Sequence, residues 1–81
     1  MQNYPNPFNN KSTVTYTLNK QAEISFKVID LAGREVVSQN YGMVQPGQHS
    51  IILNANQFSA GLYFYSITSS GSTVTEKMVV Y

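Results

Sequence analysis

A repeated alternation of apolar and polar side chains limits the fold of this chain more than any other feature. In residues 12–18, the apolar side chains of Val14, Tyr16 and Leu18 are separated by threonines. Residues 22–30 repeat the pattern, with Ile24, Phe26 and Val28 on the inward face and polar residues between them. A period of two places successive side chains on opposite faces of an extended strand, so each run predicts a strand that is buried on one face. No segment sustains the spacing of three or four that an amphipathic helix needs.

Turn-forming residues divide the chain at intervals of roughly eight to twelve residues, which is the spacing of a β-sandwich or a small barrel. Asp30 begins one turn and holds its backbone, and Gly33 supplies the positive φ of a type I turn with a bulge. Pro46-Gly47 and Ser70-Gly71 mark two more turns. Further strands are expected at residues 35–43, 49–53, 62–68 and 72–81. The sequence therefore predicts an all-β protein with about seven short strands.

Residues 54–60 interrupt the alternation, and we expect a loop or one helical turn there, with Phe58 in the core. The strand that follows carries Tyr63 and Tyr65 on one face. Two readings of this pair are open. The rings could form a flat platform for a sugar, or they could pack on the inner face of the sandwich, as aromatic residues commonly do. We favour packing on the inner face.

The composition excludes several classes of function. Charged residues make up only 11% of the chain and the net charge is +1, so there is no field to gather nucleic acid or anionic lipid. No apolar run approaches the roughly 20 residues that cross a bilayer as a helix. The absence of cysteine excludes disulfides and thiolate chemistry.

The residues that commonly carry catalysis or bind metals are scarce and scattered. His49 is the single histidine, and it lies in phase with Ile51 and Leu53, so we expect a packed or rim residue. Catalytic triads and zinc sites both need partners that this chain does not supply. The four carboxylates are isolated from one another in sequence. We therefore expect no enzymatic activity, no cofactor and no metal.

Prolines and asparagines distinguish the N-terminal segment, residues 2–11, from the rest of the chain. Pro5 and Pro7 exclude a helix and favour extended backbone. Tyr4 and Phe8 are expected to serve as apolar anchors, in either a linker or a lid over one end of the core. We expect residues 1–81 to form a single domain, cut from a longer chain, with the sandwich in residues 12–81.

Six short motifs occur in order along nearly the whole chain. They are Tyr4, Pro5, Asn6, Pro7 and Phe8; the strand at residues 12–18; Asp30, Gly33, Arg34 and Val36; Pro46 and Gly47; Phe58, Gly61 and Tyr63; and Lys-Met-Val-Val at 77–80. In these motifs the chain resembles the type A C-terminal sorting domain of the type IX secretion system, the Por secretion system family.

The resemblance implies a small immunoglobulin-like antiparallel β-sandwich that ends an exported protein of a Gram-negative bacterium. It implies an address read by an outer-membrane translocon, with a cargo N-terminal to it in the parent chain. The cargo would pass from the periplasm through the outer membrane. A sortase-like peptidase would then remove the domain, and the cargo would be attached to the cell surface or released. A reading from another class is a fibronectin-like or carbohydrate-binding spacer of a secreted enzyme.

The final strand is the expected recognition feature. An apolar strand at a chain end can present backbone donors and acceptors to a partner sheet. The residues that we expect the translocon to recognise are Lys77, Met78, Val79, Val80 and Tyr81. Lys77 is the single charged side chain among them. We hold two interpretations of it open: it sets the register with a partner strand, or it is a solvated residue whose charge protects the edge strand from aggregation.

Overall fold

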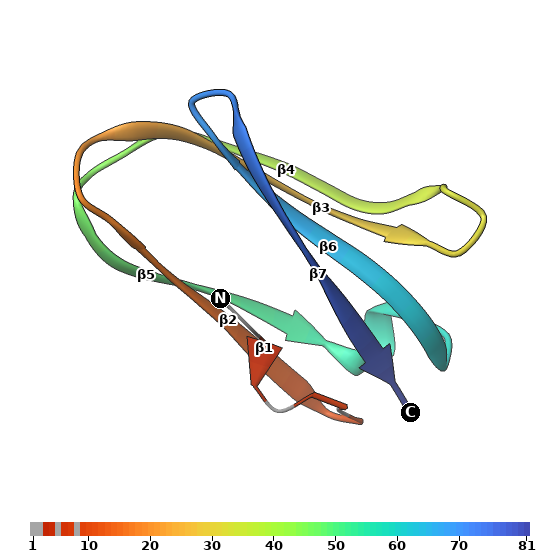
Figure 1. Ribbon diagram of the computed structural model, residues 1–81. Coiled ribbons are helices and arrows are strands. Elements are labelled where there is room, and N and C mark those ends of the chain that lie inside the picture. The colour runs from red at the N-terminus through yellow and green to blue at the C-terminus, as the bar shows by residue number, and fades with distance from the viewer. Residues whose placement is uncertain (1–2, 5, 8) are drawn as a thin grey trace.

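The computed structural model describes residues 3–4, 6–7 and 9–81, and their strands form two antiparallel sheets (Figure 1). The three-stranded sheet has the order β1-β2-β5, with bounds Asn3–Tyr4, Lys11–Leu18 and Gly47–Asn54. The four-stranded sheet has the order β4-β3-β6-β7, with bounds Glu35–Val44, Ala22–Asp30, Gly61–Ser69 and Ser72–Val80. A single 3₁₀ turn, η1 (Ala55–Gln57), is the one helical element among the described residues. The all-β prediction and the small two-sheet sandwich are confirmed.

The core lies between the sheets and is built from the faces that the alternation predicted. Val14 of β2 and the run Ile24, Phe26 and Val28 of β3 are buried, while Glu23 and Lys27 are exposed. The buried hydrophobic residues form one cluster: Val14, Ala22, Ile24, Phe26, Val28, Ile51, Leu53, Phe58, Tyr63, Tyr65, Ile67, Met78 and Val80. The burial follows the period of two because neighbouring residues of a strand point to opposite faces of its sheet.

Two hairpin turns have the geometry that their sequences demand. Between β3 and β4, the Gly33 N–H donates to the Asp30 carbonyl and the Asp30 N–H donates to the Arg34 carbonyl, each at 3.0 Å. Gly33 has φ +85°, as the type I turn with a bulge predicts. Between β6 and β7, Ser70 and Gly71 have φ +47° and +92°, the signs of a two-residue type I′ turn.

The predictions for Phe58, Tyr63 and Tyr65 can be compared with their burial in the structure. Phe58 follows the 3₁₀ turn and is buried, as expected. Tyr63 and Tyr65 are 7% and 0% exposed, which confirms the inner-face reading and overturns the sugar platform. The Tyr65 ring lies 6.0 Å from Phe26 and the Tyr63 ring 5.2 Å from Phe58, so both pairs fill the space between the sheets.

The N-terminal segment contacts both sheets, but one of its expected anchors is wrong. Tyr4 is 82% exposed, because the two-residue strand β1 pairs at the margin of the sandwich with Thr13 and Val14. Phe8 and Pro5 lie outside the described residues. The Asn10 carbonyl instead accepts the Ala55 N–H at 2.7 Å, which attaches the segment to η1. Backbone and amide hydrogen bonds therefore hold the described residues of this segment.

Candidate docking edge

Strand β7 forms a regular outer edge of the four-stranded sheet. Among the described residues it pairs only with β6, and every residue of β7 has a partner there without a register shift. An antiparallel strand directs the N–H and C=O of alternate residues to the same side, so half of the β7 backbone faces away from β6. Such a row of backbone groups is the template for an added strand.

The opposite edge of this sheet, strand β4, is irregular. Its pairing with β3 shifts between Ile24 and Ser25 and again between Val28 and Ile29. At the first shift Gly42 has φ +69°, and its N–H donates to the side chain of Asn40 at 2.9 Å. Bulges bend and twist a strand and so discourage edge-to-edge pairing. The two edges therefore differ, and β7 is the one that suits a partner strand.

Asn6 of the N-terminal segment already occupies one point on the β7 edge. Its Nδ2 donates to the Lys77 carbonyl at 3.2 Å, and its Oδ1 accepts the Val79 N–H at 3.0 Å. These bonds join residues that are 71 and 73 positions apart in the sequence. They also show that Lys77 and Val79 turn backbone groups away from β6. By the alternation of the strand, Thr73 and Thr75 do the same.

The side chains of the terminal residues divide between the core and the surface. Met78 and Val80 are buried between the sheets, at 0% and 3% exposure. Lys77 is exposed, Val79 is half-buried on the outer face, and Tyr81 lies just beyond the end of β7 and is 70% exposed. At this end of β7 a partner would meet the backbone and the outer-face side chains, because Met78 and Val80 are already packed in the core.

An uncharged groove adjoins the first half of β7. It lies between β2 and β7 and has a volume of about 490 Å³. None of the described residues that line it is charged. Ile67 and Val74 contribute apolar surface from the four-stranded sheet, and Leu18 contributes it from β2. Val74 is 51% exposed although it lies on the inner phase of β7, opposite Ile67. The sandwich thus leaves apolar surface uncovered beside the edge strand.

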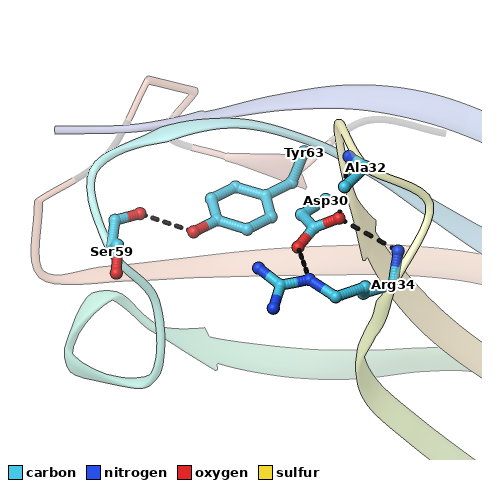
Figure 2. A network of polar contacts seen from close by, with 5 residues as sticks. All are labelled: Asp30, Ala32, Arg34, Ser59 and Tyr63. Atoms are coloured by element: carbon cyan, nitrogen blue, oxygen red, sulfur yellow. Dashed lines mark hydrogen bonds and ion pairs between the residues drawn. The ribbon is translucent and has the colours of Figure 1, made fainter.

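Asp30 and Arg34 of the third motif form a polar network around the β3–β4 turn (Figure 2). The Asp30 carboxylate accepts the backbone N–H groups of Ala32 and Arg34 at 2.9 and 3.0 Å. It also accepts from the Arg34 Nε at 3.0 Å, and this ion pair lies at the surface. These bonds hold the pKa of Asp30 below its ordinary value of 3.8, with the Arg34 backbone N–H as the largest cause. The expected role of Asp30 in fixing the turn is confirmed.

The pKa of Asp30 makes the stability of the domain depend on pH in the acid range. A carboxyl whose pKa is lowered by folding contributes stability above its unfolded value, and that stability is lost as pH falls through the folded value. We therefore expect the melting temperature to fall as pH drops from about 4 to about 2. Asp30→Asn keeps an acceptor for the turn but does not titrate. Its thermal unfolding should show a smaller acid dependence by circular dichroism, and an equal dependence would contradict this role.

Folding brings the turn network and the chain end into one row across the four-stranded sheet. Asp30 is the register partner of Tyr63, and Tyr63 is the partner of Met78. The Tyr63 hydroxyl donates to the Ser59 carbonyl at 2.6 Å and so holds the loop before β6, as Figure 2 shows. Met78 lies between the two residues that Asn6 binds. Motifs that are far apart in the sequence therefore meet at the end of the sandwich where β7 ends.

The Pro46-Gly47 motif and His49 lie away from this row of residues. Pro46 precedes β5 and Gly47 is its first residue, at the opposite end of the sandwich, where Gly47 pairs with Leu18. His49 is half-buried at the rim, its Nε2 lies 2.8 Å from the Gln45 carbonyl, and its ring lies 5.6 Å from the Tyr16 ring at a tilt of 32°. This agrees with a packed rim residue. Among the described residues no cluster of three candidate metal ligands occurs, and no helix has the length and hydropathy to cross a bilayer.

The contact that sequence reasoning missed is the one made by Asn6. The segment around it predicted extended backbone and nothing about its partner, because the bonded strand lies at the other end of the chain. The position of Asn6 within the Tyr4–Phe8 motif, one of those on which the family resemblance rests, was the one available signal.

Comparison with known families finds a match to a secretion-related domain. The sequence model described as the secretion system C-terminal sorting domain matches residues 2–81, nearly the whole chain. No curated protein and no solved structure gives a significant match.

Proposed function

Since this chain belongs to the secretion system C-terminal sorting domain family, we propose that it directs an N-terminal cargo through the outer membrane by the type IX secretion system and that β7 is the element the translocon reads. The observation that carries the second part is the contrast between the two edges of the four-stranded sheet. The β4 edge is broken by two shifts in register, whereas the β7 edge is regular along its whole length.

The mode of recognition is the addition of a strand to β7. In this mode backbone hydrogen bonds supply affinity, and pockets for alternate side chains supply specificity. The uncharged groove beside Val74 would receive apolar side chains of the added strand, so the partner should alternate apolar and polar residues. On the outer face the exposed Lys77 offers the one charge near the chain end, and an acidic residue of the partner would set the register there.

We also propose the later steps that the sequence resemblance implies. After the cargo has passed from the periplasm through the outer membrane, a sortase-like peptidase removes the domain, and the cargo is attached to the cell surface or released. The domain is then a substrate and carries no catalytic residues of its own. As a single sorting domain, residues 1–81 use the N-terminal segment to join the cargo to the sandwich.

The spacer alternative predicts a different dependence on position. A spacer would work at any place in a parent chain, whereas a sorting signal read through its last strand must end the chain. The buried positions of Tyr63 and Tyr65 remove the sugar platform on which the carbohydrate-binding version rested.

A reporter fusion tests the proposal. A periplasmic fluorescent protein followed by residues 1–81 should reach the medium or the cell surface in a bacterium that has the secretion system. The same domain placed before the reporter is the matched control, and it should leave the reporter in the periplasm. Export from both arrangements, or from neither, would contradict a C-terminal signal. Fractionation and immunoblotting give the measurement.

A further inference from the structure

The Asn6 carboxamide binds β7 as a strand would. A carboxamide presents an N–H donor and a C=O acceptor side by side, and a residue of a β-strand likewise directs its own N–H and C=O to one side of the strand. Asn6 uses both of them, with Nδ2 on the Lys77 carbonyl and Oδ1 on the Val79 N–H. The two bonded groups flank Met78 on the side of β7 that faces away from β6.

A strand added to this edge would need the same two groups. An added strand forms a ladder with the outward N–H and C=O groups of the edge strand, and at this end of β7 those groups belong to Lys77 and Val79. The Lys77 carbonyl and the Val79 N–H cannot keep both of their bonds to Asn6 and also form the ladder with a partner strand. Docking of Asn6 and docking of a partner strand are therefore in competition.

We propose that Asn6 is a clasp that closes the recognition edge of β7 and that a partner strand of the translocon displaces it. This inference rests on the proposed role of β7 as the recognised strand, and it adds how access to that strand is controlled. The partner that fits is an extended segment with its own backbone groups free, since only such a segment replaces both bonds of Asn6 and continues toward Thr75 and Thr73.

The clasp is suited to removal. Both Asn6 bonds lie at the exposed surface, where water competes and each hydrogen bond contributes little net free energy. A partner ladder offers several such bonds along β7 and also covers the apolar groove beside Val74. The closed state would protect an aggregation-prone edge before the translocon is reached. Displacement of Asn6 also separates the N-terminal segment from β7. Docking of a partner on β7 therefore releases the segment that joins the domain to the cargo.

Hydrogen exchange at the Val79 amide tests the clasp without any translocon. Asn6→Leu keeps the size of the side chain but removes its donor and its acceptor. In the isolated domain, exchange of the Val79 N–H measured by NMR should become faster by about five- to tenfold, because its acceptor, the Asn6 Oδ1, is lost. Amides of the central strand β3, such as that of Phe26, should be unchanged. Asn9→Leu is the matched control, since Asn9 is exposed in the same segment.

Two outcomes of the exchange experiment decide the matter. Unchanged exchange at Val79 in a folded Asn6→Leu domain overturns the clasp. If Asn6→Leu loses protection throughout β3, Asn6→Ser is measured instead, because a serine hydroxyl is too short to bridge both backbone groups. Faster exchange limited to the β7 edge supports the clasp.

Export then separates the clasp from the proposed function. With the reporter fusion, Asn6→Leu should leave secretion at least as fast as in the parent, because the partner no longer has to displace a competitor. Loss of secretion from a folded Asn6→Leu fusion would make Asn6 a required contact and overturn the clasp. The role of β7 is judged by a different variant, Thr75→Pro, so either idea can fail while the other stands.

Discussion

Thr75→Pro should abolish export of a fused reporter while the domain remains folded. Thr75 is exposed near the middle of β7, and its backbone groups point away from β6 by the same alternation that turns Lys77 and Val79 toward Asn6. Proline has no N–H to donate, and its ring occupies the space that an added strand needs. Proline is tolerated on an edge strand when the lost N–H faces solvent. Fractionation of the fusion should find the reporter almost entirely in the periplasm.

The control for this substitution is Thr75→Val, which keeps the N–H and the β-branched shape but removes the hydroxyl. It should be exported as the parent is, with a similar melting temperature. The melting temperature of the isolated Thr75→Pro domain must also be measured, and we expect a loss of at most about 1 kcal/mol of stability because no ladder bond to β6 is removed. Normal export of a folded Thr75→Pro fusion would exclude strand addition along this edge.

Tyr65→Ala should leave the domain unfolded at room temperature. Tyr65 is 0% exposed and packs against Phe26 in the middle of the core. Replacement of a large buried aromatic side chain by alanine costs about 3–5 kcal/mol, through lost burial and the cavity that remains. A scaffold of this size has a net stability of only about 3–5 kcal/mol, so the loss equals the whole reserve. Far-ultraviolet circular dichroism and the dispersion of NMR amide signals would both report the loss of structure.

Phe64→Ala provides the comparison within the same strand. Phe64 is the neighbour of Tyr65 but lies on the outer face, half-buried beside Lys77. Its removal creates no cavity between the sheets, so the domain should retain a cooperative unfolding transition. A Tyr65→Ala domain with a transition as steep and as warm as that of Phe64→Ala would contradict the assignment of Tyr65 to the core.

Truncation of the last strand is a poor test of recognition. Removal of residues 77–81 takes away the backbone that Asn6 binds, and with it Met78 and Val80, whose side chains fill the core. Such a chain would fail to be exported whether its signal or its fold was lost. Single substitutions on the outward side of β7 change the edge and leave the core side chains in place.

The strands, their buried faces and their turns were predictable because the information is local. A period of two is present in the sequence of β2 and β3 whatever lies on the other side of the core. The turn at Gly33 follows from one glycine with a positive φ and one aspartate that bonds the adjacent backbone. The burial of Phe58 was likewise visible as an aromatic residue in an otherwise polar loop.

The order of the strands was decided only by the tertiary structure. So was the fact that β7 forms the regular edge of the four-stranded sheet. Alternation shows which side chains of a strand face inward, but it does not show which strand lies beside which. The same limit hid the exposure of Tyr4 and the contact of Asn6 with Lys77 and Val79, since pairing between residues more than 70 positions apart leaves no periodic trace. The sequence determined what each segment is, because backbone geometry and burial act over a few neighbouring residues. Folding determined which segments meet, because hydrogen-bonding groups find distant partners only when both sheets are in place.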